Sequence, residues 1–435
     1  MIQTFFLPGR VCSTAAVREI AAQASAPYTM ICLKPDIEWV YLGQERMMQV
    51  MEMSGATMVY ADHFAKIGES VTEAPVIDYQ AGALRDDFDF GAVLLWDTRK
   101  LKAIVAEMDT EYAYAGLYDL RLRAEKPEHI PEYLYYEVET DTRKSGEKLF
   151  DYVDPRNRQV QVQMEACVTA HLKRIGAYLA PSAYKPLPEA GAYPVTASVI
   201  IPCKNRARTI ADAVQSALNQ KVRAPYSFNV IVVDDNSTDG TAEKIQAIQD
   251  DKLVYIAQDK TWHAIGGNWN VAIHDPRCGK YAIQLDSDDT YFDETTVQQF
   301  IDAFESGSFG MVIGTYQLTN MAGEILPPGV IDHREWTDDN GRNNALRING
   351  LGAPRGFYVP LLRTINYPTT KYGEDYAVGL RISREWPIGR IYNVLYNCRR
   401  WEDNSDANCD IVAMNRNNWY KDRLRTWELQ ARMKK

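Results

Sequence analysis

Three aspartates in one short stretch are the first residues of this chain that could do chemistry. The segment IQLDSDDTYF, residues 283 to 292, places apolar or neutral residues before Asp286, Asp288 and Asp289. Packing does not explain this pattern, because aspartate forms strands poorly and a buried unpaired carboxylate is costly. Two carboxylates spaced two residues apart are able to face one bound cation, and hard oxygen ligands favour Mg²⁺ or Mn²⁺ over zinc. An acidic turn is the competing interpretation, and the context of the motif must decide.

The hydrophobic pattern predicts the elements that would position these carboxylates. Residues 196–201 and 228–235 predict buried strands, and residues 209–220 and 241–249 predict helices that follow them. Strands alternating with helices predict a parallel sheet, whose ligands lie at the carboxyl ends of the strands. The polar strand ends are residues 202–205, 234–237 and 286–289. The aspartates are therefore predicted to form one wall of a cleft.

Composition bounds the class of protein. The chain has 435 residues, of which 46% are apolar, and its formal net charge is −10 with a pI near 5.3. This length predicts two domains, and the acidic balance argues against a nucleic acid partner. Seven cysteines without a CxxC pair predict reduced thiols in a cytoplasmic protein. We expect no signal peptide, and no apolar run reaches the roughly 18 residues needed to cross a bilayer.

A proline-rich segment predicts the domain boundary. Residues 180–194 hold four prolines, which continue neither a helix nor a strand well. We therefore divide the chain into a first domain, a linker, a second domain and a basic amphipathic helix. Their predicted bounds are residues 1–180, 181–194, 195–412 and 413–435.

Four motifs occur in a fixed order between residues 196 and 400. They are SVIIPCKNRARTIADAVQSALNQ, IVVDDNSTDGT, LDSDD and YGEDYAVGLRIS. Together they resemble an inverting family 2 glycosyltransferase with the GT-A fold. The resemblance implies an α/β fold with a Rossmann-like, mostly parallel sheet between helices. It also implies a nucleotide-sugar donor, usually a UDP-sugar, a Mn²⁺ or Mg²⁺ cofactor, and a saccharide or lipid-linked acceptor.

On the donor side, the resemblance implies that Asp235 contacts the base. Asp286 is in the position that reaches the ribose, and Asp288 is in the position that ligates the metal bridging the two phosphates. The other residues implied to bind the donor are Pro202, Lys204, Asn205 and Gly267. A divalent ion suits this acidic protein, because the departing nucleoside diphosphate develops negative charge.

On the acceptor side, Asp375 matches the family's general base, which takes the proton of the acceptor hydroxyl. The alternative for Asp375 is an N-terminal helix acid that interacts with the helix dipole. The sugar and acceptor pocket is predicted to contain Gly352, Arg355, Glu374 and Trp401. Arg355 either faces an anion or forms an ordinary surface pair.

One position departs from the family pattern. Trp401 stands where family members often have a histidine that adds a metal contact. Either Asp288 holds the ion with water and the diphosphate, or Glu402 or Asp403 substitutes for the histidine. The indole of Trp401 either packs or lines the donor site, and the sequence leaves both open.

The first domain repeats features of the second without their chemistry. Residues 28–40 resemble residues 281–292, and residues 116–141 resemble residues 376–403. In this comparison Lys34 stands where Asp286 is, and Ala115 stands where Asp375 is. No counterpart of the base-binding strand appears before residue 180. We therefore predict a degenerate GT-A-like domain, and chance similarity between α/β domains is the alternative.

Two other classes of protein remain open. A non-catalytic assembly or binding protein of polysaccharide synthesis is compatible with a degenerate first domain. A sugar-phosphate nucleotidyltransferase is disfavoured, because it needs a glycine-rich phosphate loop where this chain has residues 203–206, CKNR.

The last residues mix basic and aromatic side chains. The basic residues of the segment 417–435 are Lys421, Arg423, Arg425, Arg432, Lys434 and Lys435. Such a helix either makes a peripheral contact with the inner face of an anionic membrane or packs its aromatic residues on the second domain.

Overall fold

The computed structural model describes residues 1–434 except 142, 144–147, 149–153, 183, 260–262, 403 and 405–408. The chain divides into two units, and each unit is an α/β structure on its own mixed sheet. Unit 1 comprises Met1–Tyr178, Leu346–Ile348 and Asn408–Lys435, and unit 2 comprises Leu179–Ala345 and Asn349–Ala407. The predicted α/β class is confirmed for both.

Unit 2 is built on a nine-stranded sheet with the order β10-β9-β8-β11-β15-β13-β16-β12, and β14 pairs with β13. Its strands are β8 Ala197–Cys203, β9 Phe228–Asp234, β10 Leu253–Ala257, β11 Tyr281–Gln284, β12 Thr290–Tyr291, β13 Met311–Thr319, β14 Ile325–Ile331, β15 Arg355–Tyr358 and β16 Ile388–Arg399. Its helices are α7 Ile210–Leu218, α8 Thr241–Gln246, α9 Ala264–His274, α10 Thr296–Ser306, α11 Gly341–Asn344, α12 Val359–Ile365 and α13 Glu374–Glu385.

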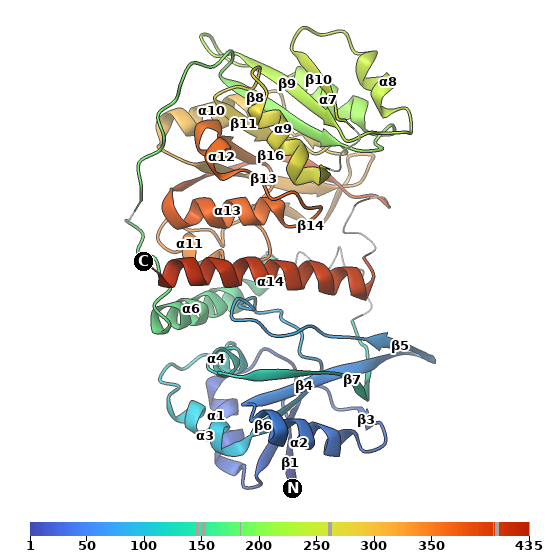
Figure 1. Cartoon of the computed structure of the whole chain (residues 1–435), viewed down its shortest axis with the longest axis vertical. Helices are drawn as coiled ribbons and strands as arrows, with labels where there is room; N and C mark the ends of the chain where they lie inside the picture. The colour runs from blue at the N-terminus through green and yellow to red at the C-terminus, as the bar shows by residue number, and fades with distance from the viewer. Residues whose placement is uncertain are drawn as a thin grey trace. The chain divides into compact units, whose positions relative to one another are not determined.

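The parallel half of this sheet carries the predicted site. Strands β10, β9, β8 and β11 run parallel, so the carboxyl ends of β8, β9 and β11 share one edge. Every residue of β8 and β9 is buried, as expected of strands in a sheet covered on both faces. Helices α7 and α10 pack on β8. Helix α9 packs on β8 and β9, and helices α12 and α13 pack against α9 (Figure 1). Strand β15 enters antiparallel, which makes the sheet mixed.

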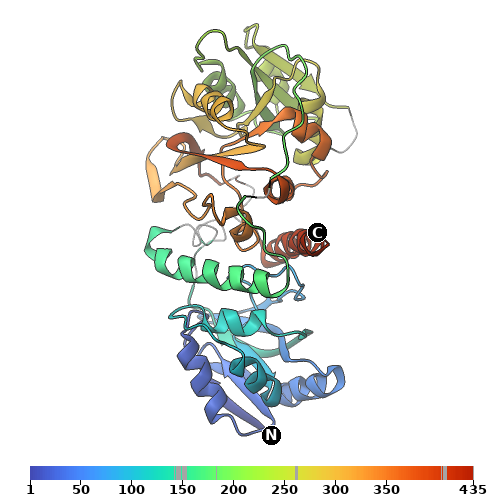
Figure 2. The ribbon, with the colours of Figure 1, turned by 90° about the vertical axis from the view of Figure 1, so that its left-hand side faces the viewer.

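Unit 1 has a seven-stranded sheet with the order β1-β2-β6-β4-β7-β3, and β5 pairs with β4. Its strands are β1 Ile2–Phe6, β2 Tyr28–Cys32, β3 Ile37–Trp39, β4 Met58–Ile67, β5 Ser70–Ala74, β6 Val93–Asp97 and β7 Pro127–Val138. Its helices are α1 Thr14–Gln23, α2 Gly43–Ser54, α3 Thr98–Ala106, α4 Gly116–Leu122, η2 Pro155–Asn157, α6 Arg158–Arg174 and α14 Ile411–Met433. Helices α1 and α3 pack against each other over one core, and α2 covers a second core (Figures 1 and 2).

The two sheets repeat one topology. The order β1-β2-β6-β4-β7-β3 corresponds to β8-β11-β15-β13-β16-β12. Each pair of neighbouring strands has the same relative direction, parallel or antiparallel, as its counterpart in the other sheet. Strand β5 pairs with β4 as β14 pairs with β13. The pair Glu38 and Tyr136 matches the pair Thr290 and Asn397, at offsets of 252 and 261 residues. This correspondence supports the predicted internal duplicate. The described part of unit 1 has no counterparts of β9 and β10.

The C-terminal helix α14, which the sequence left as a separate segment, is part of unit 1. The buried basic residues on it, each at most 7% exposed, are Lys421, Arg425 and Arg432. Arg425 donates to Asp422 at 2.8 Å, and both side chains are fully buried. Arg432 likewise donates to Glu428 at 2.8 Å, so Arg425 and Arg432 each pair with a carboxylate on the same helix. Lys435 lies outside the described residues. Among the helices described, none combines the length and apolar composition needed to cross a bilayer.

Candidate functional site

The first two strand ends of unit 2 are tied together by hydrogen bonds. Lys204 Nζ lies 3.5 Å from Asp235 Oδ2. Asn205 has a left-handed φ of 51°, its backbone N–H donates to Ser237 Oγ at 2.8 Å, and its Oδ1 accepts from the Thr238 N–H at 2.9 Å. The side chain of Asn205 therefore fixes the shape of the loop. Pro202 is buried within β8.

Asp234 has a structural role that the sequence left open. Its carboxylate accepts from the Ser237 backbone N–H at 3.0 Å and from the Tyr255 hydroxyl at 3.0 Å. Asp234 is 3% exposed. It caps the turn after β9, which leaves Asp235 as the carboxylate at this strand end that pairs with Lys204.

The third strand end gathers negative charge. Burial raises the pKa of Asp286, a hydrogen bond from Gln284 opposes this, and the charge of Asp288 raises it further. Burial also raises the pKa of Asp289 well above its ordinary value, and the charges of Asp288 and Asp286 add to the effect. Asp289 accepts the Arg399 backbone N–H at 2.7 Å, which holds the loop against β16. A cation at this edge would relieve the repulsion between the carboxylates.

Asp288 is surrounded by hydrogen-bond donors that the motif did not indicate. Its Oδ2 accepts from Trp401 Nε1 at 3.1 Å and from Asn404 Nδ2 at 3.4 Å. Arg206 Nε lies 3.9 Å from the same oxygen. Trp401 therefore contacts the predicted metal ligand instead of only packing. Sequence reasoning missed Asn404 and Arg206, because both sit in loops and join Asp288 across many residues.

The residues fit a divalent ion held through a single carboxylate rather than a closed protein cage. In the described part of the chain, no group of three or more His, Cys, Asp or Glu residues is arranged to hold a metal. Glu402 is paired with Arg208 at 2.8 Å, and Asp403 lies outside the described residues. Asp288 would hold such an ion with oxygens from the diphosphate and water, which is how Mg²⁺ usually binds at phosphate sites.

The predicted base lies in an ion pair. Asp375 is in the first turn of α13 and pairs through Oδ2 with Arg355 Nη1. Arg355 Nε also donates to Gln284 Oε1 at 2.9 Å, and Gln284 Nε2 donates to Asp286 Oδ1 at 2.9 Å. The open choice for Arg355 is thereby decided, since it faces a carboxylate in a buried setting.

Burial changes the protonation of Glu374, the residue before Asp375. Burial raises the pKa of Glu374 to about 8, and the negative charge of Asp375 adds to this effect. The side chain is therefore mostly protonated near neutral pH. A protonated carboxyl donates a hydrogen bond and does not accept a proton, which favours Asp375 as the base.

Glu374 is expected to make stability depend on pH. Its folded pKa of about 8 lies above the ordinary value of 4.5, so the folded state binds the extra proton between these values. The free energy of unfolding should therefore fall as pH rises through this window, by on the order of 2–4 kcal/mol. Urea unfolding of the wild type and Glu374→Gln at about pH 5 and about pH 9 measures this. An equal pH dependence in both proteins would contradict the assignment.

The two glycines predicted at the site, Gly267 and Gly352, lie where a side chain would clash within unit 2. A Cβ at Gly267 would lie 2.9 Å from the His263 Cβ, and one at its neighbour Gly266 would lie 2.0 Å from the Pro368 carbonyl oxygen. Gly352 has φ of 82°, and a Cβ there would lie 2.5 Å from Ile313 Cγ2. Gly352 thus permits the left-handed turn that leads into β15.

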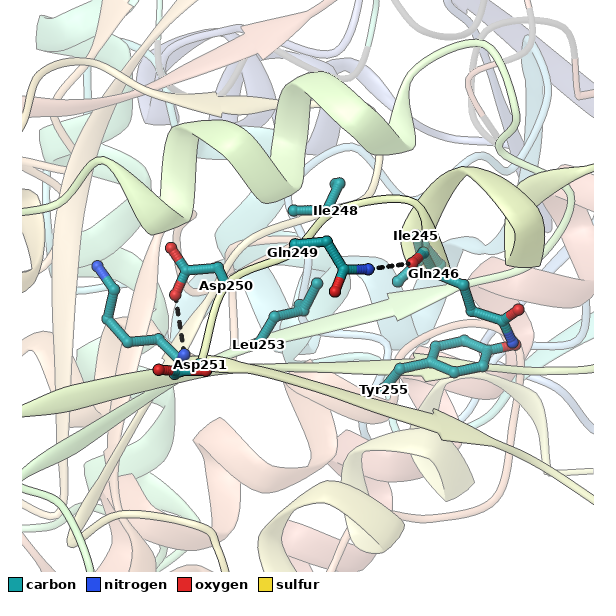
Figure 3. Close-up of a pocket in the computed structure, with 9 residues that line it drawn as sticks. Ile245, Gln246, Ile248, Gln249, Asp250, Asp251, Leu253 and Tyr255 are labelled. Carbon is teal, nitrogen blue, oxygen red and sulfur yellow. Dashed lines mark hydrogen bonds between the residues drawn. The ribbon is translucent and has the colours of Figure 1, made fainter.

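A hollow of about 720 Å³ lies beside the edge strand β10 (Figure 3). It is lined by residues of α8, the following loop and β10, and it contains none of the predicted site residues. Within it, the Lys252 N–H donates to Asp250 Oδ1 at 2.8 Å, and Gln249 Nε2 donates to the Gln246 carbonyl at 3.1 Å. The groups able to do chemistry lie instead at the carboxyl ends of the strands.

The equivalent positions in unit 1 are neutralised internally. Lys34 donates to Glu137 Oε1 at 2.8 Å, and His63 Nε2 lies 3.2 Å from the same oxygen. Burial raises the pKa of Glu137, but His63 and Lys34 outweigh it and leave the pKa below its ordinary value. Residues 112–115, Tyr-Ala-Tyr-Ala, precede α4 and carry no carboxylate. Among the described residues of unit 1, the equivalent positions therefore carry neither the carboxylate pair nor a counterpart of the base.

Comparison with known proteins identifies the segment that holds these strand ends. Residues 198–357 match the family model described as "Glycosyl transferase family 2". The chain is 28% identical over 233 residues to "Succinoglycan biosynthesis protein ExoU" of Rhizobium meliloti (strain 1021), a match covering 48% of this chain and 61% of that protein. The chain thus spans less than two thirds of that relative.

For a second relative and one solved structure, the match covers a larger share of the other protein's length. The chain is 24% identical over 238 residues to "UDP-Glc:alpha-D-GlcNAc-diphosphoundecaprenol beta-1,3-glucosyltransferase WfgD" of Escherichia coli, a match covering 53% of this chain and 84% of that protein. The structure described as "Crystal structure of S. aureus TarS 1-349 in complex with UDP-GlcNAc" has 19% identity, covers 55% of this chain and 72% of its own, and has a TM-score of 0.42. A structural likeness at that level says nothing about the substrate of this chain.

Proposed function

Residues 198–357 belong to glycosyl transferase family 2, and from that premise we propose that the protein is a metal-dependent, inverting glycosyltransferase. The proposed donor is a UDP-sugar, and the proposed acceptor is a hydroxyl of a saccharide or a lipid-linked saccharide. The name of the E. coli relative, which includes both UDP-Glc and a diphosphoundecaprenol, supports this choice of donor and acceptor.

One observation carries the proposal. Asp235 follows β9, and Asp286 and Asp288 follow β11, at one edge of the parallel half of the sheet; hydrogen bonds continue from Asp286 through Gln284 and Arg355 to Asp375. Carboxylates at a strand edge suit a nucleotide sugar, and a further carboxylate at a helix start suits the acceptor side. A binding protein without catalysis does not need this second carboxylate.

In the proposed reaction, Asp235 binds the base and Asp286 binds the ribose. Asp288 would hold a divalent ion, which when bound neutralises the charge of the leaving diphosphate. Asp375 accepts the proton of the acceptor hydroxyl while the hydroxyl oxygen of the acceptor attacks the anomeric carbon from the face opposite the leaving group. Attack from that face inverts the configuration. Arg206 lies beside Asp288 and is available to meet phosphate charge.

The proposal is tested by incubating the purified chain with a panel of nucleotide sugars and following release of the nucleoside diphosphate, with and without short saccharide acceptors. We expect release from at least one UDP-sugar, with acceleration by acceptor. Tight binding of a UDP-sugar without release or transfer across the panel would instead favour a non-catalytic binding protein.

The metal is expected to strengthen nucleotide binding through Asp288. Calorimetric titration of UDP should give tighter binding with Mn²⁺ present than with EDTA, because an ion held by Asp288 would offset the negative charge of the diphosphate. Asp288→Asn should remove most of this difference, while Asp339→Asn, at an exposed aspartate elsewhere in unit 2, should preserve it. Equal UDP affinity with Mn²⁺ and with EDTA would exclude a metal-bridged donor complex.

A further inference from the structure

We propose that Gln284 and Arg355 are positioning residues that connect the donor side of the site to Asp375. The inference rests on the proposed function. It assigns a role to Gln284, which precedes the aspartate motif, and a more specific role to Arg355. The two side chains form a chain of hydrogen bonds between the carboxylate proposed to bind ribose and the carboxylate proposed to act as base.

Strand register brings the two side chains together. Strand β15 begins at Arg355 and runs antiparallel to β11, with Gly356 opposite Ile283. Gln284 is the last residue of β11, so it lies next to Arg355 at the strand ends. Gln284 is 4% exposed and Arg355 is 9% exposed. Both polar groups are therefore buried at the edge where the site residues gather.

Arg355 is held from two directions. Its Nε donates to Gln284 Oε1 at 2.9 Å, and its Nη1 pairs with Asp375 Oδ2. Burial lowers the pKa of Arg355, but the nearby carboxylates of Asp375 and Asp286 outweigh this effect, so the pKa stays above its ordinary value. A charged planar guanidinium fixed at two atoms gives the carboxylate of Asp375 one defined direction.

The amide of Gln284 fits this arrangement in one orientation only. Its carbonyl oxygen accepts from Arg355, and its NH₂ group donates to Asp286 Oδ1 at 2.9 Å. Exchanging the oxygen and nitrogen would turn NH₂ toward a guanidinium and a carbonyl toward a carboxylate, which loses both hydrogen bonds. The amide therefore matches a cation on one side to an anion on the other.

This arrangement has a consequence for catalysis. A base must point at the acceptor hydroxyl within hydrogen-bond distance, and a misplacement of about 1 Å can cost about 10² in rate. Because Arg355 is anchored on Gln284, and Gln284 on Asp286, the direction of Asp375 depends on the same strand end that binds the donor. Loss of either link should lower kcat more than it weakens donor binding.

A purely structural ion pair would behave differently. If Arg355 and Gln284 only compensated for buried charge, their replacement would lower stability and leave the kcat of the folded protein unchanged. If instead they contacted the substrate directly and uniformly, the KM for the donor would rise at constant kcat. The measurement must therefore separate kcat, KM and stability.

The test compares Gln284→Met, Arg355→Lys, Arg355→Met and the double variant Gln284→Met with Arg355→Lys in the full chain. The matched control is Gln317→Met, because Gln317 also lies in the sheet of unit 2 and donates to Asn397 at 2.8 Å, outside this hydrogen-bond chain. Each protein is assayed for kcat and donor KM with the best UDP-sugar of the wild type. Thermal unfolding and UDP titration verify that each variant is folded.

We expect kcat to fall about 10-fold or more in Gln284→Met and Arg355→Lys, with the donor KM within about threefold of the wild type. The double variant should be no slower than the slower single variant, because both act through one chain. Lysine should retain more activity than methionine at 355, since it keeps the charge. Unchanged kcat in folded single variants, or losses that multiply in the double variant, would overturn the inference while the proposed function stands. A wild type without transfer or donor hydrolysis would overturn both.

Discussion

Asp375→Asn is expected to bind UDP-sugar as tightly as the wild type and to lower kcat by about 10² or more. The amide keeps the size and shape of the carboxylate, but it cannot accept the proton of the acceptor hydroxyl. The structure gives a reason to choose this residue, because Asp375 pairs with the guanidinium of Arg355, whereas burial raises the pKa of Glu374 to about 8. Steady-state kinetics with a fixed acceptor and varied donor separates the two effects.

Matched variants make this result specific. Asp339→Asn makes the same change at an exposed position of unit 2 and should leave kcat unaltered. Glu374→Gln keeps a neutral hydrogen-bond donor beside Asp375 and should lower kcat much less than Asp375→Asn. If Glu374→Gln were the inactive variant and Asp375→Asn retained turnover, the base would be Glu374, and its ionisation near pH 8 would set the pH optimum.

The parallel half of unit 2 was predictable from sequence because its signals are local. The apolar runs that became β8 and β9 and the polar residues after them are continuous in the chain. The carboxyl ends of neighbouring parallel strands meet at one edge of the sheet, independently of how the other strands are arranged. The antiparallel entry of β15 has no comparable local signal, since a four-residue strand, Arg355–Tyr358, is too short to show a period.

The partners of the site carboxylates were not predictable. The contact of Trp401 with Asp288 joins residues 113 positions apart, and the pair of Arg355 with Asp375 joins residues 20 apart through a strand and a helix. Sequence spacing shows neither, because both depend on where β16 and β15 enter the sheet. Residue types did indicate that cations or donors were needed, since buried carboxylates require partners.

The C-terminal helix shows the opposite limit of sequence reasoning. Basic and aromatic residues in one helix left open both a membrane contact and packing of the aromatic residues, and neither alternative foresaw that Arg425 and Asp422 are fully buried together in unit 1. A pattern reports which residues share a helix face, but it does not report what that face contacts. The internal duplicate was more accessible, because a constant offset between similar segments reports a shared topology without any knowledge of contacts.

The full chain is expected to bind one nucleotide, and Asp235→Ala combined with Asp288→Ala should abolish that binding. In unit 2, Asp235 directly follows β9, and the described part of unit 1 has no counterpart of β9 or β10. At the position of Asp286, unit 1 has Lys34, which is paired with Glu137 at 2.8 Å. An ammonium held there would repel a divalent ion placed beside it.

The control for this experiment lies in unit 1 itself. Asp36 is exposed and corresponds to Asp288 at the offset of 252 residues, so Asp36→Ala should leave both the stoichiometry and the affinity for UDP unchanged. Calorimetry with UDP and Mn²⁺ gives the number of sites for the wild type, for Asp36→Ala and for the double variant. A site that survived in the double variant and disappeared with Asp36→Ala would mean that the internal ion pair of Lys34 and Glu137 opens to admit a donor. The two units would then be two donor-binding domains in tandem.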